Sequence, residues 1–114
     1  MDLMPRVFVV QEPQRRQKDG SFAAAFDLTP AAEYGDIELL LDTGVKVGIA
    51  MQPLVVQFKK KLRDFSDDDY VLPVGDPAAM GIAIAVAAMQ NQGRVKLLRW
   101  DRRQERYIKL QVEL

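Results

Sequence analysis

The stretch from Tyr70 to Trp100 constrains the fold of this chain more than any other part of the sequence. It reads YVLPVG, then DP, then an uncharged apolar run that ends at a glycine, and then RVKLLRW. This order is typical of a strand, a turn capped by Asp76 with Pro77 at the first helical position, a helix that stops at Gly93, and a second strand. Strands joined in this way lie parallel with a right-handed crossover, so the sequence predicts a βαβ unit.

Further elements flank this predicted unit. Residues 6–11 lack alternation, as a strand buried on both faces does, and residues 36–42 form the next predicted strand. Residues 53–65 carry an apolar stripe at helical spacing and are predicted to form an amphipathic helix. Pro73 has no N–H to donate, so the strand that begins at Tyr70 is predicted to end early or to lie at a sheet edge.

Shorter features complete the predicted fold. QRRQKDGS is predicted to be a loop or the tip of a hairpin that returns through FAAAFDL. TPAAEYG is predicted to be a short helix with Thr29 as its cap and Pro30 at the first helical position. Alternation over residues 108–114 is typical of an antiparallel strand with one wet face. Together these features predict an α/β fold, a single domain over residues 1–114 with a mixed, mostly parallel sheet flanked by helices and a C-terminal antiparallel hairpin.

The composition excludes several kinds of site. The chain has no cysteine and no histidine, which rules out disulfides, thiolate metal sites and catalytic triads that use an imidazole. Basic and acidic residues balance at 16 each, which argues against simple polyanion binding by the whole chain. The first ten residues, MDLMPRVFVV, lack the long apolar core of a signal peptide. We therefore expect a protein that acts by binding, without a cofactor, more than an enzyme.

The predicted helix over residues 77–92 contains no charged residue, although a surface helix ordinarily has a polar face. Small residues recur along one side of it at Gly81, Ala85 and Ala88. A small domain does not enclose a helix on every side, so we expect this side to meet other protein, either the helix at residues 53–65 or a second copy of the chain. The competing interpretation is that these apolar residues simply stay exposed, as many do.

Two other stretches resemble ligand sites weakly. PVGDP follows a strand and precedes a helix, as phosphate loops do, yet it has one glycine and places a carboxylate where a phosphate would sit. DFSDDDY gathers acids from Asp64 to Asp69, but it lacks the glycine and the spacing of a calcium loop. We interpret these stretches as a capped corner and a solvated turn. A magnesium-dependent nucleotide enzyme would need distant acids such as Asp42, Asp67 and Asp76 to meet.

The last part of the chain is basic and aromatic. From Arg94 onward there are seven lysines and arginines against three acids. Basic side chains interleaved with aromatic rings on a hairpin can hold single-stranded nucleic acid by charge and stacking. Two arginines before the predicted turn at Asp19 add to this set. The candidate nucleic-acid-binding residues are Arg15, Arg16, Lys96, Arg99, Trp100, Arg102, Arg103, Arg106 and Tyr107.

A simpler interpretation competes with nucleic-acid binding. Trp100 would pack in the core, and the arginines would pair with Asp101, Glu105 and acids elsewhere in the chain. Because the formal net charge is zero, the sequence favours this interpretation. It predicts a buried Trp100 and arginines held in ion pairs.

Four blocks of the sequence resemble a group of short proteins encoded by tailed bacteriophages. The blocks are VFVVQEP, FDLTPAAEYG, LRDFSDDDYVLPVGDP and GRVKLLRWDRRQERYI, and together they cover most of the chain. The resemblance implies a phage accessory protein in the host cytoplasm, and it transfers no catalytic residue. Small phage accessory proteins commonly act by binding a host protein or nucleic acid, so the resemblance favours a binding module.

The leading hypothesis from the sequence is a non-enzymatic, homo-oligomeric binding module for a host or phage protein. Single-stranded nucleic-acid binding through the C-terminal hairpin is the alternative, and a magnesium-dependent nucleotide enzyme is the weakest hypothesis. No contact with a membrane is expected, because the apolar helix is too short and its flanks are too polar.

Overall fold

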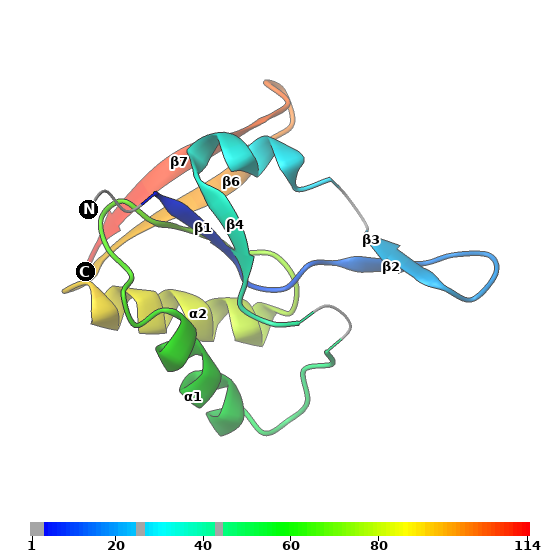
Figure 1. Ribbon diagram of the computed structural model, residues 1–114, viewed down its shortest axis with the longest axis horizontal. Coiled ribbons are helices and arrows are strands. Elements are labelled where there is room, and N and C mark those ends of the chain that lie inside the picture. Colours follow the sequence, from blue (N-terminus) through cyan, green and yellow to red (C-terminus); the bar gives the residue numbers. More distant parts are fainter. Residues whose placement is uncertain (1–3, 25–26, 43–44) are drawn as a thin grey trace.

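A five-stranded mixed sheet organises the fold, which a computed structural model describes for residues 4–24, 27–42 and 45–114 (Figure 1). The strands lie in the order β4 (Asp36–Leu39), β1 (Arg6–Val9), β5 (Tyr70–Leu72), β6 (Arg94–Asp101) and β7 (Arg106–Glu113). Strands β4, β1, β5 and β6 are parallel neighbours, and β7 returns antiparallel to β6. The predicted α/β class, with a mostly parallel sheet and a C-terminal antiparallel hairpin, is confirmed.

The two faces of the sheet are covered by different kinds of helix (Figure 1). Helices α1 (Gln52–Lys61) and α2 (Pro77–Gln90) pack against each other and against one face. On the other face lies η1 (Thr29–Tyr34), a 3-10 helix that contacts β1 and β7. Each face has its own apolar cluster, a larger one around Phe58 under the α-helices and a smaller one around Tyr107 under η1.

The predicted βαβ unit is present as β5, α2 and β6. The Asp76 carboxylate accepts a hydrogen bond from the Ala79 N–H at 3.1 Å, and Pro77 is the first helical residue, as predicted. Gly75 precedes this cap with a φ of 105°, and a Cβ placed there would lie 2.5 Å from the Cβ of Gln11. The corner therefore requires glycine for its backbone geometry, and PVGDP forms the capped turn that the sequence predicts.

Strand β5 is short, although it lies in the middle of the sheet. It ends at Leu72 because Pro73 has no N–H to continue the ladder, so the prediction of an early end is confirmed. The other predicted outcome, an edge strand, is wrong, since β1 and β6 flank β5 on its two sides. The register joins Val71 of β5 to Leu97 of β6, and β6 continues to Asp101 past the end of its neighbour.

Two predicted helices differ in detail. The Thr29 backbone N–H donates to the Asp27 carboxylate at 2.8 Å, so Thr29 is not the cap that the sequence predicts. Asp27 takes that part because an aspartate readily accepts the N–H two residues ahead of it. Helix α1 ends at Lys61 rather than Phe65, although Phe65 is buried beyond its end.

A separate antiparallel hairpin, β2 (Gln14–Arg16) with β3 (Phe22–Ala24), projects away from the body of the molecule (Figure 1). At its turn the Ser21 N–H donates to the Asp19 carboxylate at 2.9 Å. The predicted hairpin is therefore present in this segment. Residues 25–26 of the predicted return strand lie outside the described residues.

Candidate binding surface

Trp100 lies near the tip of the β6–β7 hairpin and is 41% exposed, so the prediction of a core tryptophan is wrong. Tyr107, which is opposite it in the hairpin, is buried, and the two rings meet edge to face with centroids 5.0 Å apart. The Tyr107 carbonyl accepts a hydrogen bond from the Tyr34 hydroxyl at 2.6 Å, and burial raises the pKa of the Tyr107 phenol. Tyr107 therefore supports the Trp100 ring and leaves it facing solvent.

A mostly apolar hollow of about 830 Å³ opens beside Trp100. It forms because β5 ends at Leu72 whereas β6 continues beyond it, so the described part of the chain places no strand next to Trp100 on that side. Residues at the start of η1 form another wall. The residues that define its chemistry are Asp27, Pro30, Leu72, Arg99, Trp100 and Arg102.

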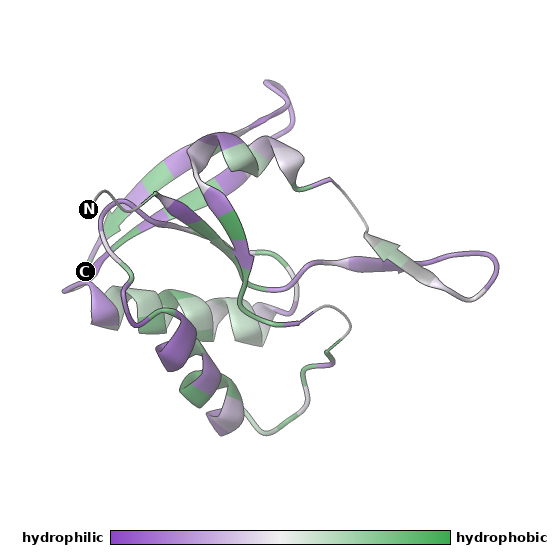
Figure 2. Cartoon of the chain, in the orientation of Figure 1, coloured by the Kyte–Doolittle hydropathy of each residue, from purple (hydrophilic) through white to green (hydrophobic). Residues whose placement is uncertain are grey.

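Among the residues that the structure describes, the basic side chains at the hairpin tip do not form the ion pairs that the sequence predicts. The exposed arginines of this region are Arg99, Arg102, Arg103 and Arg106. The ion pairs found among the described residues involve other arginines, Arg6 and Arg94. The Asp101 carboxylate, which was a predicted partner, accepts the backbone N–H groups of Arg103 and Gln104 instead. The hairpin tip therefore carries a net positive charge, four arginines against Asp101 and Glu105, and Figure 2 shows it as a hydrophilic segment.

The other predicted nucleic-acid contacts lie away from the hollow. The Lys96 ammonium sits over the Tyr70 ring, 4.3 Å from its centroid. Arg15 and Arg16 are exposed on β2, in the hairpin that projects in a different direction (Figure 1). The predicted set is thus divided among the hollow, the sheet and the projecting hairpin, and the sequence alone did not indicate this division.

The outer side of α2 is apolar and partly uncovered, and Figure 2 shows the helix as hydrophobic along most of its length. Gly81 and Ala85 are exposed, and a Cβ at Gly81 would meet nothing within 4 Å. Ala88, which the sequence places on this side, is buried in the core, and Met89 is 72% exposed instead. We call Gly81, Ala85 and Met89 the α2 stripe. Within the described ranges, no helix has the length and apolar character needed to span a membrane.

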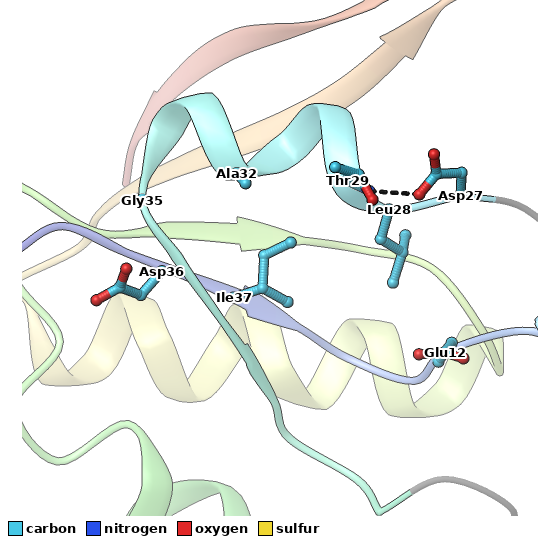
Figure 3. A pocket seen from close by; sticks show the side chains of 8 residues that line it. All are labelled: Glu12, Asp27, Leu28, Thr29, Ala32, Gly35, Asp36 and Ile37. Carbon is cyan, nitrogen blue, oxygen red and sulfur yellow. Dashed lines mark hydrogen bonds between the residues drawn. The ribbon is translucent and has the colours of Figure 1, made fainter.

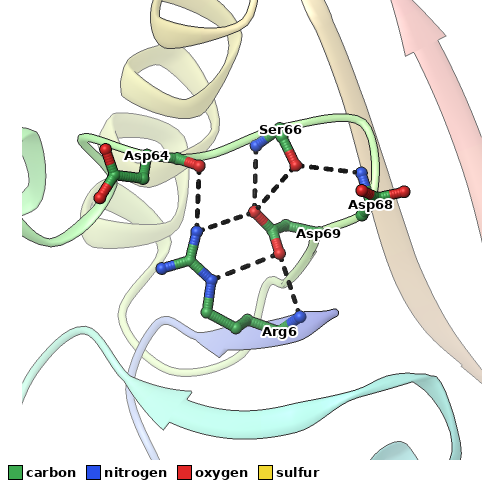
Figure 4. A network of polar contacts seen from close by, with 5 residues as sticks. All are labelled: Arg6, Asp64, Ser66, Asp68 and Asp69. Atoms are coloured by element: carbon green, nitrogen blue, oxygen red, sulfur yellow. Dashed lines mark hydrogen bonds and ion pairs between the residues drawn. The ribbon is translucent and has the colours of Figure 1, made fainter. Parts of the chain in front are cut away.

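One member of the acidic cluster is a buried structural residue (Figure 4). Asp69 is 3% exposed, and its carboxylate accepts hydrogen bonds at 3.0 Å from the Arg6 backbone, the Arg6 guanidinium and the Ser66 backbone. The Arg6 guanidinium also donates to the Asp64 carbonyl. This network satisfies the carboxylate completely and ties the start of β1 to the turn before β5, so Asp69 serves the fold.

The acids of the predicted magnesium site lie apart. Asp67 pairs with Arg94 before the amino end of β5, whereas Asp76 caps α2 beyond the carboxyl end of the same strand. Asp42 therefore cannot bind one cation together with both Asp67 and Asp76. Among the described residues no three acids are grouped closely enough to hold a metal ion. The prediction of a magnesium site built from these residues is wrong.

A second hollow, of about 670 Å³, lies between η1 and β4 (Figure 3). Its charged lining residues are all acidic, Glu12, Asp27 and Asp36, and Figure 3 shows them spread around it rather than converging. They come from separate segments, so no sequence motif marks this hollow. Asp27 is shared with the hollow beside Trp100, which places it at the boundary between an acidic surface and a basic one.

Comparisons with known proteins agree with the resemblance that the sequence blocks indicate. No curated protein and no solved structure matches the chain significantly. A family model described as Phage Pam3 gp32-like protein matches residues 5–114, which is nearly the whole chain. The chain therefore belongs to the Phage Pam3 gp32-like protein family.

Proposed function

We propose that this phage protein is a non-enzymatic binding module whose β6–β7 hairpin holds single-stranded nucleic acid. The observation that carries the proposal is the exposed Trp100 beside an apolar hollow, flanked by arginines that form no ion pair with any described residue. An exposed indole offers a face on which an unpaired base can stack, and the arginines offer charge for its phosphates. A duplex hides the faces of its bases, so a single strand fits this surface better.

Two corrections change the order of the hypotheses. The sequence favours a buried Trp100 and paired arginines, which would leave little for a nucleic acid to contact. The structure exposes Trp100 and leaves Arg99 and Arg102 beside it without ion pairs in the described residues. Zero net charge does not oppose the proposal, because association depends on the local field, and arginines outnumber acids at the hairpin tip.

The proposal is tested with a fluorescein-labelled thymidine 20-mer and fluorescence anisotropy at increasing salt. We expect binding that weakens as salt rises, with a log–log slope of about −0.7 for each phosphate contacted. Changing Arg102→Glu together with Arg103→Glu is expected to lower the affinity about tenfold or more and to flatten this slope. No binding by the native protein at low salt would refute the proposal.

A matched control separates a local site from general attraction by charge. Arg15→Glu with Arg16→Glu makes the same change of charge on the projecting hairpin, at exposed positions away from the hollow. We expect this variant to bind within about threefold of the native protein, because distant exposed charges are largely screened. Equal losses in the two double variants would show that the hairpin tip is not a specific site.

A second candidate function is carried by the α2 stripe, a protein-contact surface for a second copy of the chain. Gly81 and Ala85 leave the backbone open to close approach, and Met89 adds an exposed, adaptable apolar side chain. The helix has no charged residue over Pro77–Gln90 to oppose such a contact. Self-association of this kind is compatible with nucleic-acid binding, since α2 and η1 lie on opposite faces of the sheet.

Sedimentation velocity at micromolar concentration tests the second candidate. We expect a dimer that Ala85→Glu converts to a monomer, because a charge buried in an apolar interface is strongly unfavourable. Ala32→Glu is the control, since Ala32 is exposed on η1 on the other face. A native monomer at all concentrations would remove self-association through α2.

A further inference from the structure

The hollow beside Trp100 contains a carboxylate, which a simple phosphate site would not. Asp27 lines the hollow together with Arg99 and Arg102. The Thr29 backbone N–H fixes one of its oxygens at 2.8 Å. Hydrogen bonds from the Thr29 hydroxyl and backbone hold the pKa of Asp27 below its usual value, so the group is an anion at neutral pH. The group of a ligand that lies beside it must therefore be a hydrogen-bond donor, not a phosphate.

Nucleobases differ in the donors that they offer to a carboxylate. Guanine carries two adjacent donors on one edge, its ring N–H and its exocyclic amino group. Cytosine and adenine each present an amino group beside an acceptor, and thymine presents a single N–H between two carbonyls. A carboxylate therefore pairs best with guanine, and it meets an acceptor or a single donor on the other bases.

We propose that the hollow takes one unstacked base, that this base lies against Trp100, and that Asp27 selects guanine. Arg99 and Arg102 would then contact the phosphates on either side of that base. The apolar walls from Pro30 and Leu72 would contact the base, and Asp27, which is exposed, would meet its donor edge. This proposal rests on the proposed function and adds a base preference to it.

The single tryptophan of the chain makes Trp100 emission a direct report of the hollow. Quenching is titrated with thymidine heptamers in which the central base is thymine, guanine, cytosine or adenine. We expect the guanine strand to bind about tenfold more tightly than the all-thymine strand, in the range of one good bidentate base contact. Asp27→Asn should reduce this ratio to about twofold or less, because the amide replaces one acceptor with a donor.

The asparagine variant is chosen because its side-chain oxygen can still accept the Thr29 N–H, and a thermal melt checks that the fold is retained. Asp36→Asn is the matched control. It removes one negative charge at an exposed residue that lines the other hollow (Figure 3), so the guanine preference should stay within about twofold of the native value.

Several outcomes would overturn the inference. Equal affinity for all four strands, or a guanine preference that survives Asp27→Asn, would refute base selection by Asp27 while salt-dependent binding of thymidine strands keeps the proposed function intact. No quenching by any strand, together with no binding of the labelled 20-mer, would refute both. Quenching by an acidic peptide that contains phenylalanine, without quenching by oligonucleotides, would make the hollow a peptide site and would also refute the inference.

Discussion

The two faces of the sheet are formed by the same five strands but differ in how completely helices cover them. On one face, α1 and α2 bury Phe58 and Leu62 fully. On the other face, η1 spans six residues, and Trp100 at the edge of its reach stays 41% exposed. The candidate site is therefore a consequence of thin cover, since a 3-10 helix of this length cannot span the face to the tip of the hairpin.

The largest expected difference between the faces concerns stability. Phe58→Ala removes a fully buried ring from the cluster under the α-helices, and it is expected to lower the free energy of unfolding by about 3–5 kcal/mol. Val56→Ala on the same helix, where the side chain is 49% exposed, is expected to cost about 0.5 kcal/mol or less. Urea denaturation measures the free energy of unfolding of both variants. Similar losses in Phe58→Ala and Val56→Ala would show that the face under the α-helices is not tightly packed.

A smaller effect is expected at the join between η1 and the hairpin. Tyr34→Phe removes the hydroxyl that donates to the Tyr107 carbonyl at 2.6 Å, and it is expected to lower the free energy of unfolding by about 1 kcal/mol. Trp100 emission should change as well, because Tyr107 supports that ring. Tyr70→Phe is the comparison variant, since it removes a hydroxyl from the ring beside Tyr34 and leaves the Tyr34–Tyr107 bond intact. An unchanged Trp100 spectrum in Tyr34→Phe would argue against this support.

The smallest effect concerns pH at the start of η1. Hydrogen bonds from Thr29 lower the folded-state pKa of Asp27 below its unfolded value, which is about 3.9. The stability that Asp27 adds is therefore fully present above the unfolded pKa and is lost as pH falls through the lowered folded pKa. The difference in urea midpoint between the native protein and Asp27→Ala should thus be constant near neutral pH and shrink below about pH 4. A difference that grows on acidification would contradict this assignment.

Local signals predicted most of the fold. The cap at Asp76, the proline at position 77 and the alternation in the last strand each act within a few residues, so they can be interpreted without knowing the rest of the chain. Thr29 is the instructive failure, because it is the first residue of η1 and not its cap, and its own backbone N–H donates to the Asp27 carboxylate. Local chemistry was correctly identified there, but its position along the chain was two residues away.

The candidate site could not be predicted in the same way, because it depends on where separate elements stop. Trp100 is exposed because β5 ends at Leu72 and η1 covers a different part of the face. Pro73 indicates from the sequence that β5 ends early. The sequence does not indicate that β5 lies in the middle of the sheet, which is why its early end leaves a hollow. Likewise, Met89 is exposed on the outer side of α2 where the sequence predicted Ala88. This difference depends on how the packed helix is rotated about its axis, which only its tertiary contacts decide.

The projecting β2–β3 hairpin has a practical consequence for work on this protein. Its turn at Gly20 has a φ of 89°, and a Cβ placed there would meet nothing within 4 Å. Such exposed loop tips accept insertions with little effect on the core that they leave. A fluorophore, an affinity tag or a tether to a surface can therefore be attached between Lys18 and Ser21, which leaves both the hollow and the α2 stripe unobstructed for single-molecule measurements.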